Sequence, residues 1–133
     1  MNELAKAFWD HALKALRTAQ RDFSLDTDAS ASRSYYAGFY AVSAWFALQN
    51  KRFSKHSAIE VAVHRDLVKT GLWPEQGGAD FSFLRRTRVR SDYEAIEDTS
   101  EDDAREALAA AQRILELIHS ARPDLFPLPQ EKP

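Results

Sequence analysis

The sequence contains no cysteine, so disulfide bonds, thiolate nucleophiles and thiolate-ligated zinc are excluded. Its four histidines are scattered along the chain, and none has the spacing of a metal site. We therefore predict no metal and no cofactor. No apolar run approaches the length of a membrane span, and the first residues carry acids within their apolar pattern, unlike a signal peptide. The sequence predicts a cytoplasmic protein without a membrane partner.

An excess of charge of one sign is also missing. The formal net charge is −2 over 133 residues, so attraction to nucleic acid must come from a local patch. Proline is scarce until residues 122–133, which hold four of the five prolines. No segment alternates apolar and polar residues with a period of two, so no sheet is predicted. We expect one all-α domain over residues 1–121 and a Pro-rich C-terminal tail, 122–133, that packs little.

Helical periodicity covers most of residues 1–121. A first amphipathic helix carries apolar residues at steps of three and four between Ala5 and Phe23. A second helix follows the capping residues at 26–28. It has apolar stripes on opposite sides, so we expect it to be the buried central helix. Because one small bundle would not readily cover both stripes, this helix also predicts a dimer.

Capping signals mark the later helices. Ser54 or Ser57 can begin a third helix, and Gly71 can end it. Residues 72–79 contain a proline and a glycine pair, so a fourth helix is expected to begin with Asp80 as its cap. Ser100 can cap a fifth. Four or five helices with short links predict an up-and-down bundle.

The fourth helix has the most unusual composition, since residues 85–90 read RRTRVR. The simplest interpretation is a solvated face with an Arg88–Asp92 ion pair. However, Arg88 shares a stripe with Phe81 and Leu84, so we predict that its side chain either snorkels to solvent along the apolar surface or is held partly buried at an interface. Arginine is suited to phosphate because it is permanently charged and planar. Tyr93 lies about 140° round the helix from Arg88, so the two would flank a groove.

Other aromatic and basic residues are candidates for the wall of that groove. His56 shares a face with the apolar residues of the third helix, which favours a neutral, hydrogen-bonded core histidine over a catalytic one. Tyr36 and Tyr40 lie on a third face of the central helix, and Arg33 is near them in sequence. The candidate wall therefore consists of Arg33, Tyr36, Tyr40 and His56.

Three blocks of sequence, taken together and in order, resemble the HEPN superfamily, in particular its small stand-alone prokaryotic members. They are RSYYAGFYA (33–41), KHSAIEVAVHRDLVKTG (55–71) and LRRTRVRSDYEA (84–95). The resemblance implies a helical bundle that forms a homodimer about its central helices. Many members pair with a minimal nucleotidyltransferase as a toxin–antitoxin system. Some are metal-independent ribonucleases whose signature is Arg, four to six residues, then His.

On this resemblance the signature arginine is Arg88, and Tyr93 stands at the histidine position. A tyrosine with a pKa of about 10 is a poor general base at neutral pH. The expected function is a toxin-type module that binds or cleaves RNA through Arg88 and Tyr93, with Arg85, Arg86 and Arg90 widening the phosphate-binding surface. Endoribonuclease activity stays open, and a non-catalytic nucleotide-binding or protein-interaction module is the alternative.

The hydroxyl of Tyr93 is a further candidate site, because the resemblance implies that a nucleotidyltransferase could attach a nucleotide there. The competing interpretation is that Tyr93 packs on Val89, one turn back, and only seals the end of the helix.

Overall fold

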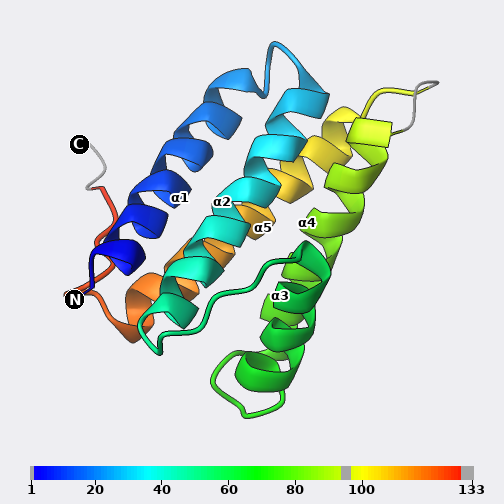
Figure 1. Cartoon of the computed structure of the whole chain (residues 1–133). Coiled ribbons are helices and arrows are strands. Elements are labelled where there is room, and N and C mark those ends of the chain that lie inside the picture. Colours follow the sequence, from blue (N-terminus) through cyan, green and yellow to red (C-terminus); the bar gives the residue numbers. More distant parts are fainter. Residues whose placement is uncertain (1, 94–96, 130–133) are drawn as a thin grey trace.

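The computed structural model describes residues 2–93 and 97–129. Within these residues the chain forms helices and no strand, which confirms the all-α prediction (Figure 1). The α-helices are α1 (Glu3–Asp22), α2 (Thr27–Ala47), α3 (His56–Ala62), α4 (Glu75–Tyr93) and α5 (Glu101–Ala121), and α3 continues into a π-helical segment, η1 (Val63–Val68). None of the described helices is long and apolar enough to cross a membrane.

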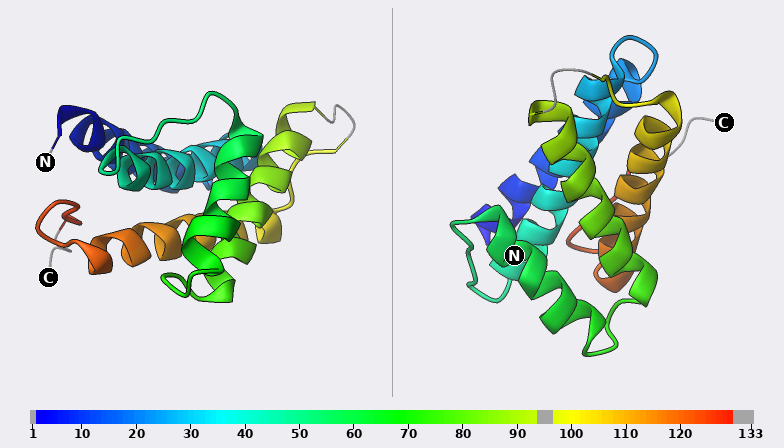
Figure 2. Two further views of the ribbon diagram at one scale, coloured as in Figure 1. Left: turned by 60° about the horizontal axis from the view of Figure 1, so that its bottom comes forward. Right: turned by 90° about the vertical axis from the view of Figure 1, so that its right-hand side faces the viewer.

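The helix α2 lies at the centre of the bundle and contacts α1, α4 and α5. The four long helices alternate in direction along the chain, as expected for an up-and-down bundle (Figure 1). In Figure 2, α1 and α2 form one layer and α5 lies on the other side of the molecule from them. The segment after α2 returns along the bundle, so the short α3 runs in the same direction as α2 and lies beside α4.

Both stripes of α2 are buried, as predicted for a central helix. Tyr35, Val42 and Phe46 are covered on one side, and Ala37 and Ala41 on the other. Small alanines allow the neighbouring helices to approach closely. The five large apolar side chains that are exposed among the described residues all lie outside α2. Phe39 and Tyr40 of α2 are only partly buried, so the dimer expected from uncovered apolar area on this helix stays a prediction.

Most of the predicted helix ends are confirmed. The carboxylate of Asp26 accepts the backbone N–H of Ala29 at 3.1 Å, and the hydroxyl of Ser100 accepts that of Asp103 at 3.0 Å. Gly71 has a φ of +83°, a left-handed conformation that glycine adopts without strain. The cap predicted for the third helix is wrong. Lys55 precedes α3, and no side chain caps that end.

The start of α4 also differs from the prediction. The helix begins at Glu75, directly after Pro74, whose missing N–H costs nothing at a helix start. The glycine pair lies inside the first turns of the helix, at positions where the neighbouring rings leave no room for a side chain. A Cβ on Gly77 would stand 2.7 Å from a ring carbon of Trp73, and one on Gly78 would stand 2.8 Å from the ring of His64.

Asp80 is therefore an interior residue of α4 and not its cap. Its side chain is 4% exposed and accepts two hydrogen bonds of 2.9 Å from Arg113 on α5. Gln76 donates a third, at 2.8 Å. This cluster ties the first half of α4 to α5, as a buried carboxylate requires when it is to remain charged.

The C-terminal segment packs more than predicted. Phe126 is fully buried, with its ring 5.2 Å from that of Trp9. The indole N–H of Trp9 donates to the carbonyl of Pro127 at 2.8 Å, and the carbonyl of Phe126 is a hydrogen-bond partner of His119 at 2.6 Å. The prolines end α5 but do not prevent residues 122–129 from closing one end of the bundle.

Candidate functional site

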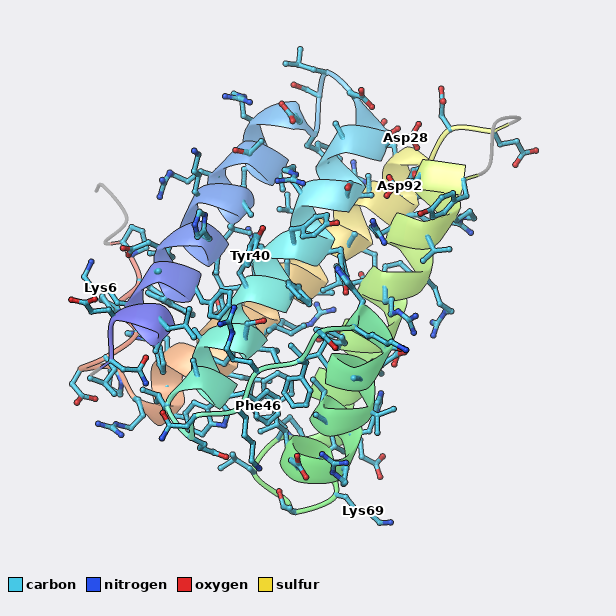
Figure 3. The ribbon with its side chains drawn as sticks, viewed as in Figure 1. Lys6, Asp28, Tyr40, Phe46, Lys69 and Asp92 are labelled. Atoms are coloured by element: carbon cyan, nitrogen blue, oxygen red, sulfur yellow. The ribbon has the colours of Figure 1, made fainter. Side chains whose placement is uncertain are left out.

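The arginines of α4 point to two sides of the helix. Phe81 and Leu84 are fully buried, and Arg88 stands on the same stripe one further turn along. The stripe carries Arg88 against α2, where its side chain is 21% exposed. The partly buried position predicted for Arg88 is therefore confirmed. Figure 3 labels Asp92, one turn beyond Arg88, at the upper end of α4.

Arg88 is held by a carboxylate and by aromatic rings. Its Nη2 donates to the hydroxyl of Tyr36 at 3.2 Å, and its Nε lies 2.9 Å from Oδ2 of Asp92, as the sequence predicted for an i,i+4 ion pair. Its guanidinium carbon lies 5.5 Å from the ring centre of Tyr36, and that of Arg33 lies 4.7 Å from the same ring. Tyr36 is thus flanked by two guanidinium groups, which its π-face stabilises.

A histidine and a second tyrosine adjoin this pair. The hydroxyl of Tyr35 lies 2.7 Å from Nδ1 of His56, and the imidazole stacks on Phe39 at 4.4 Å with the rings 11° from parallel. Burial raises the pKa of the Tyr35 phenol well above its usual range. Burial also lowers the pKa of His56, and the positive charges of Arg88 and Arg85 lower it further. The hydrogen bond to Tyr35 and the lowered pKa of His56 both agree with the prediction of a neutral, hydrogen-bonded histidine.

We name this group the inner cluster. It joins α2, α3 and α4, since its members come from residues 35–36, 56, 88 and 92. Tyr40 lies further along α2, with its ring 6.3 Å from Phe8 and 5.3 Å from His11 (Figure 3). Of the candidate wall residues, the structure therefore brings Arg33, Tyr36 and His56 to Arg88 and places Tyr40 beside α1.

The other arginines line a pocket on a neighbouring side of α4, between this helix and α3, which we name the outer pocket. It encloses about 470 Å³ and is lined by Glu60, Arg85, Arg86, Val89, Arg90 and Tyr93. Arg85 forms a 2.6 Å ion pair with Glu60, and Arg90 forms one with Asp103. Arg86 is exposed and has no ion-pair partner among the described residues. Most of the positive charge in this pocket is therefore neutralised.

Tyr93 belongs to the outer pocket, and Arg88 does not line it. The phenol of Tyr93 is 75% exposed. The two signature positions thus lie on different sides of α4, and Tyr93 does not seal the helix end by burial. The alternative that it only packs on Val89 finds little support, since Val89 is itself 40% exposed.

A larger pocket, of about 620 Å³, lies at the junction of α1 and α2. Its charged lining residues are all acidic, namely Asp26, Asp28, Asp98 and Glu101. This charge would repel phosphate. No group of three or more metal-ligating side chains is found in the described parts of the chain. The inner cluster is therefore the best candidate site for an anionic ligand.

Sequence reasoning missed two contributors to the inner cluster and its border. Tyr35 is not among the candidate residues predicted from the sequence, although its hydroxyl meets His56, 21 residues further along the chain. Glu60, which pairs with Arg85, was not singled out. Neither contact has a local signal, because both join α3 to another helix. The one sequence feature that pointed to the Tyr35–His56 contact is the adjacent pair of tyrosines at 35 and 36.

Comparison with known proteins agrees with this architecture. A HEPN domain model matches residues 5–121, which span all the helices from α1 to α5 apart from the first residues of α1. The chain is also similar to a UPF0332 protein of Thermotoga maritima. The two are 31% identical over 97 residues, which cover 73% of this chain and 74% of the relative. The chain belongs to the HEPN family.

Proposed function

We propose that this HEPN protein binds single-stranded RNA at the inner cluster, as the toxin-type member of a pair with a minimal nucleotidyltransferase. The observation that carries the proposal is the setting of Arg88. Its guanidinium is partly buried, stands against the ring of Tyr36 and, among the described residues, pairs with one carboxylate, that of Asp92. Guanidinium groups take phosphate oxygens, and half-buried aromatic rings take bases. An RNA strand presents both groups at once.

The chemistry of the cluster supports binding more than cleavage. Cleavage without a metal needs a group that accepts the proton of the attacking hydroxyl. Tyr93, at the position of the signature histidine, lies in the outer pocket, away from Arg88. His56 is near, but its Nδ1 is taken by Tyr35. Binding without cleavage is therefore the expected behaviour of the purified protein.

Replacing Arg88 tests the proposal. Arg88→Gln should weaken binding of a labelled single-stranded RNA about tenfold, because one charge-assisted phosphate contact is lost. Arg122→Gln removes the same charge from an exposed residue that follows α5 and serves as the control. Fluorescence anisotropy gives both affinities, and a gel of the same samples reports cleavage. An Arg88→Gln affinity equal to that of the control would contradict the proposal.

We also propose a homodimer, since HEPN domains commonly dimerise. The face that suits it is the half-buried aromatic surface of α1 and α2, where Phe8 and Tyr40 stack on each other. Light scattering at micromolar concentration should give twice the mass of the chain. Tyr40→Glu places a charge on this surface and should shift the mass toward one chain. A single chain mass for the unchanged protein would exclude the dimer at that concentration.

The proposed nucleotidyltransferase partner would act on Tyr93. Its exposed phenol oxygen would attack the α-phosphorus of a nucleoside triphosphate, forming a P–O bond as pyrophosphate leaves and the phenolic proton passes to solvent or to a base of the transferase. The added phosphate would lie beside Arg86 and Arg90 and would neutralise their positive charge. Such a modification would change the charge of α4 near the inner cluster.

Two substitutions of Tyr93 test its role. Tyr93→Phe should remove modification by a neighbouring nucleotidyltransferase, measured as a mass increase, while leaving RNA binding intact. Tyr93→Ala should alter the free energy of unfolding by less than about 0.5 kcal/mol, because the side chain is exposed. Should Tyr93→Ala unfold the protein, the residue packs in the fold and the modification proposal is wrong.

A protein-docking surface is the second candidate function. Three of the five exposed large apolar residues among those described, Val61, Val89 and Tyr93, lie on α3 and α4. Glu60 lines the outer pocket and also the neighbouring depression beside Val61, so the two hollows adjoin. A partner protein could cover them together. Loss of partner binding on Val89→Asp, with RNA binding unchanged, would favour this function.

A further inference from the structure

A buried tyrosine fixes the proton position of His56. Tyr35 is fully buried, and its hydroxyl has no hydrogen-bond partner among the described residues other than Nδ1 of His56, 2.7 Å away. A buried phenol is more stable when it donates its proton, and among the described residues this nitrogen is the one acceptor within reach. Nδ1 therefore carries no proton in the neutral imidazole. The proton is on Nε2.

The ring that carries this proton is held in place. Phe39 stacks on one face of the imidazole at 4.4 Å, and the ring of Tyr36 meets it edge-on at 6.0 Å. The histidine is half-buried, and its Nε2 has no partner in the described parts of the chain. Nε2 is not fully buried. An oriented N–H without a partner among the described residues is therefore within reach of solvent.

Arg88 offers donors next to the same aromatic rings. Its guanidinium carbon lies 5.9 Å from the ring centre of Tyr35 and 5.5 Å from that of Tyr36, the two tyrosines that also contact His56. The Nε–H of Arg88 is buried and has no well-directed acceptor, although the carboxylate of Asp92 is near. The charged guanidinium of Arg88 and the neutral Nε2–H of His56 therefore border the same two tyrosine rings.

We propose that His56 is a phosphate-binding residue whose Nε2–H, set by the Tyr35 hydrogen bond, acts with Arg88 on the same RNA strand. This role rests on the proposed function and adds to it a second ligand group on a different helix. A neutral donor suits the position because a second full charge beside Arg88 would be repelled when no ligand is bound. The fixed tautomer removes the need to rearrange a proton when phosphate arrives.

Three variants separate this role from a merely structural one. The amide nitrogen of glutamine can take the place of Nε2, whereas phenylalanine keeps the ring stacking but has no N–H. We expect His56→Phe to weaken binding of a ten-nucleotide RNA about tenfold and His56→Gln to retain most of the affinity. Tyr35→Phe leaves Nδ1 without its donor. It should mix the two tautomers, seen in the nitrogen chemical shifts of the imidazole, and weaken RNA binding by a smaller factor.

The possible results distinguish the role of His56 from the proposed RNA binding on which it rests. RNA binding that depends on Arg88 but is unchanged in His56→Phe, with a native circular dichroism spectrum, overturns the role of His56 alone. A protonated Nδ1 in the unchanged protein at pH 7.5 overturns it as well. If no RNA binds, the same protein is titrated with inorganic pyrophosphate while the nitrogen chemical shifts of His56 are followed. A shift of the Nε2 signal supports an anion site at His56 without the RNA-binding function. The absence of a shift overturns both the role of His56 and the RNA-binding function.

Discussion

Phe126→Ala should lower the free energy of unfolding by about 3 kcal/mol or more, which is the usual cost of removing a buried phenylalanine ring. Phe126 is fully buried against Trp9, and the ring centre of Trp45 lies 6.4 Å from that of Phe126. Its loss would free the segment after α5 and expose both indoles to water. Urea unfolding followed by circular dichroism measures the change, and tryptophan fluorescence should shift to longer wavelength.

A conservative variant controls for this result. Phe126→Leu retains most of the buried volume and should cost less than about 1.5 kcal/mol. Residues 122–129 would not close the bundle if Phe126→Ala unfolded at the same urea concentration as the unchanged protein. The segment would then pack as little as its proline content suggests.

Arg113→Met should be comparably destabilising, by about 3 kcal/mol. Arg113 is itself 40% exposed, but its partner Asp80 is buried, so removing the arginine leaves a buried charge uncompensated. In this variant the carboxylate of Asp80, which is 4% exposed, would keep only Gln76 as a hydrogen-bond donor. The methionine retains most of the apolar stem of arginine, so the loss reports the charge and its hydrogen bonds. Urea unfolding at neutral pH measures it.

The double variant Asp80→Leu with Arg113→Met provides the internal check. Apolar side chains of similar size can replace a buried ion pair at little cost, so the double variant should be more stable than Arg113→Met alone. If the two single effects simply add, the residues are not coupled, and the pair does not join α4 to α5 as the 2.9 Å contacts indicate.

Local sequence signals were enough to predict most helices. The two buried stripes of α2 follow from residue spacing, and the caps Asp26 and Ser100 follow from residue type. The signals failed where a tertiary contact reversed a local preference. Gly77 and Gly78 ordinarily weaken a helix, but here their missing side chains let α4 lie against Trp73 and His64. Phe126 was overlooked because the surrounding prolines indicated an unpacked tail.

The candidate site was predictable only in part, for the same reason. The partial burial of Arg88 follows from its place on the stripe of Phe81 and Leu84, which one helix encodes alone. Its contact with Tyr36 spans 52 positions of the sequence and has no local signature. The spacing of Arg88 and Tyr93 suggested a shared groove. The two residues are about 140° apart on the helix, and with α4 packed on α2 and α5 only Arg88 faces the inner cluster.

The most direct test of the central claim compares the two sides of α4 in one RNA-binding measurement. Arg88→Gln and Arg86→Gln remove the same charge, two positions apart, from the inner cluster and from the outer pocket. We expect Arg88→Gln to weaken RNA binding about tenfold. Arg86→Gln should weaken it by no more than about threefold, because it removes only a general attraction to phosphate. If Arg86→Gln weakens binding as much as Arg88→Gln or more, RNA does not bind at the inner cluster.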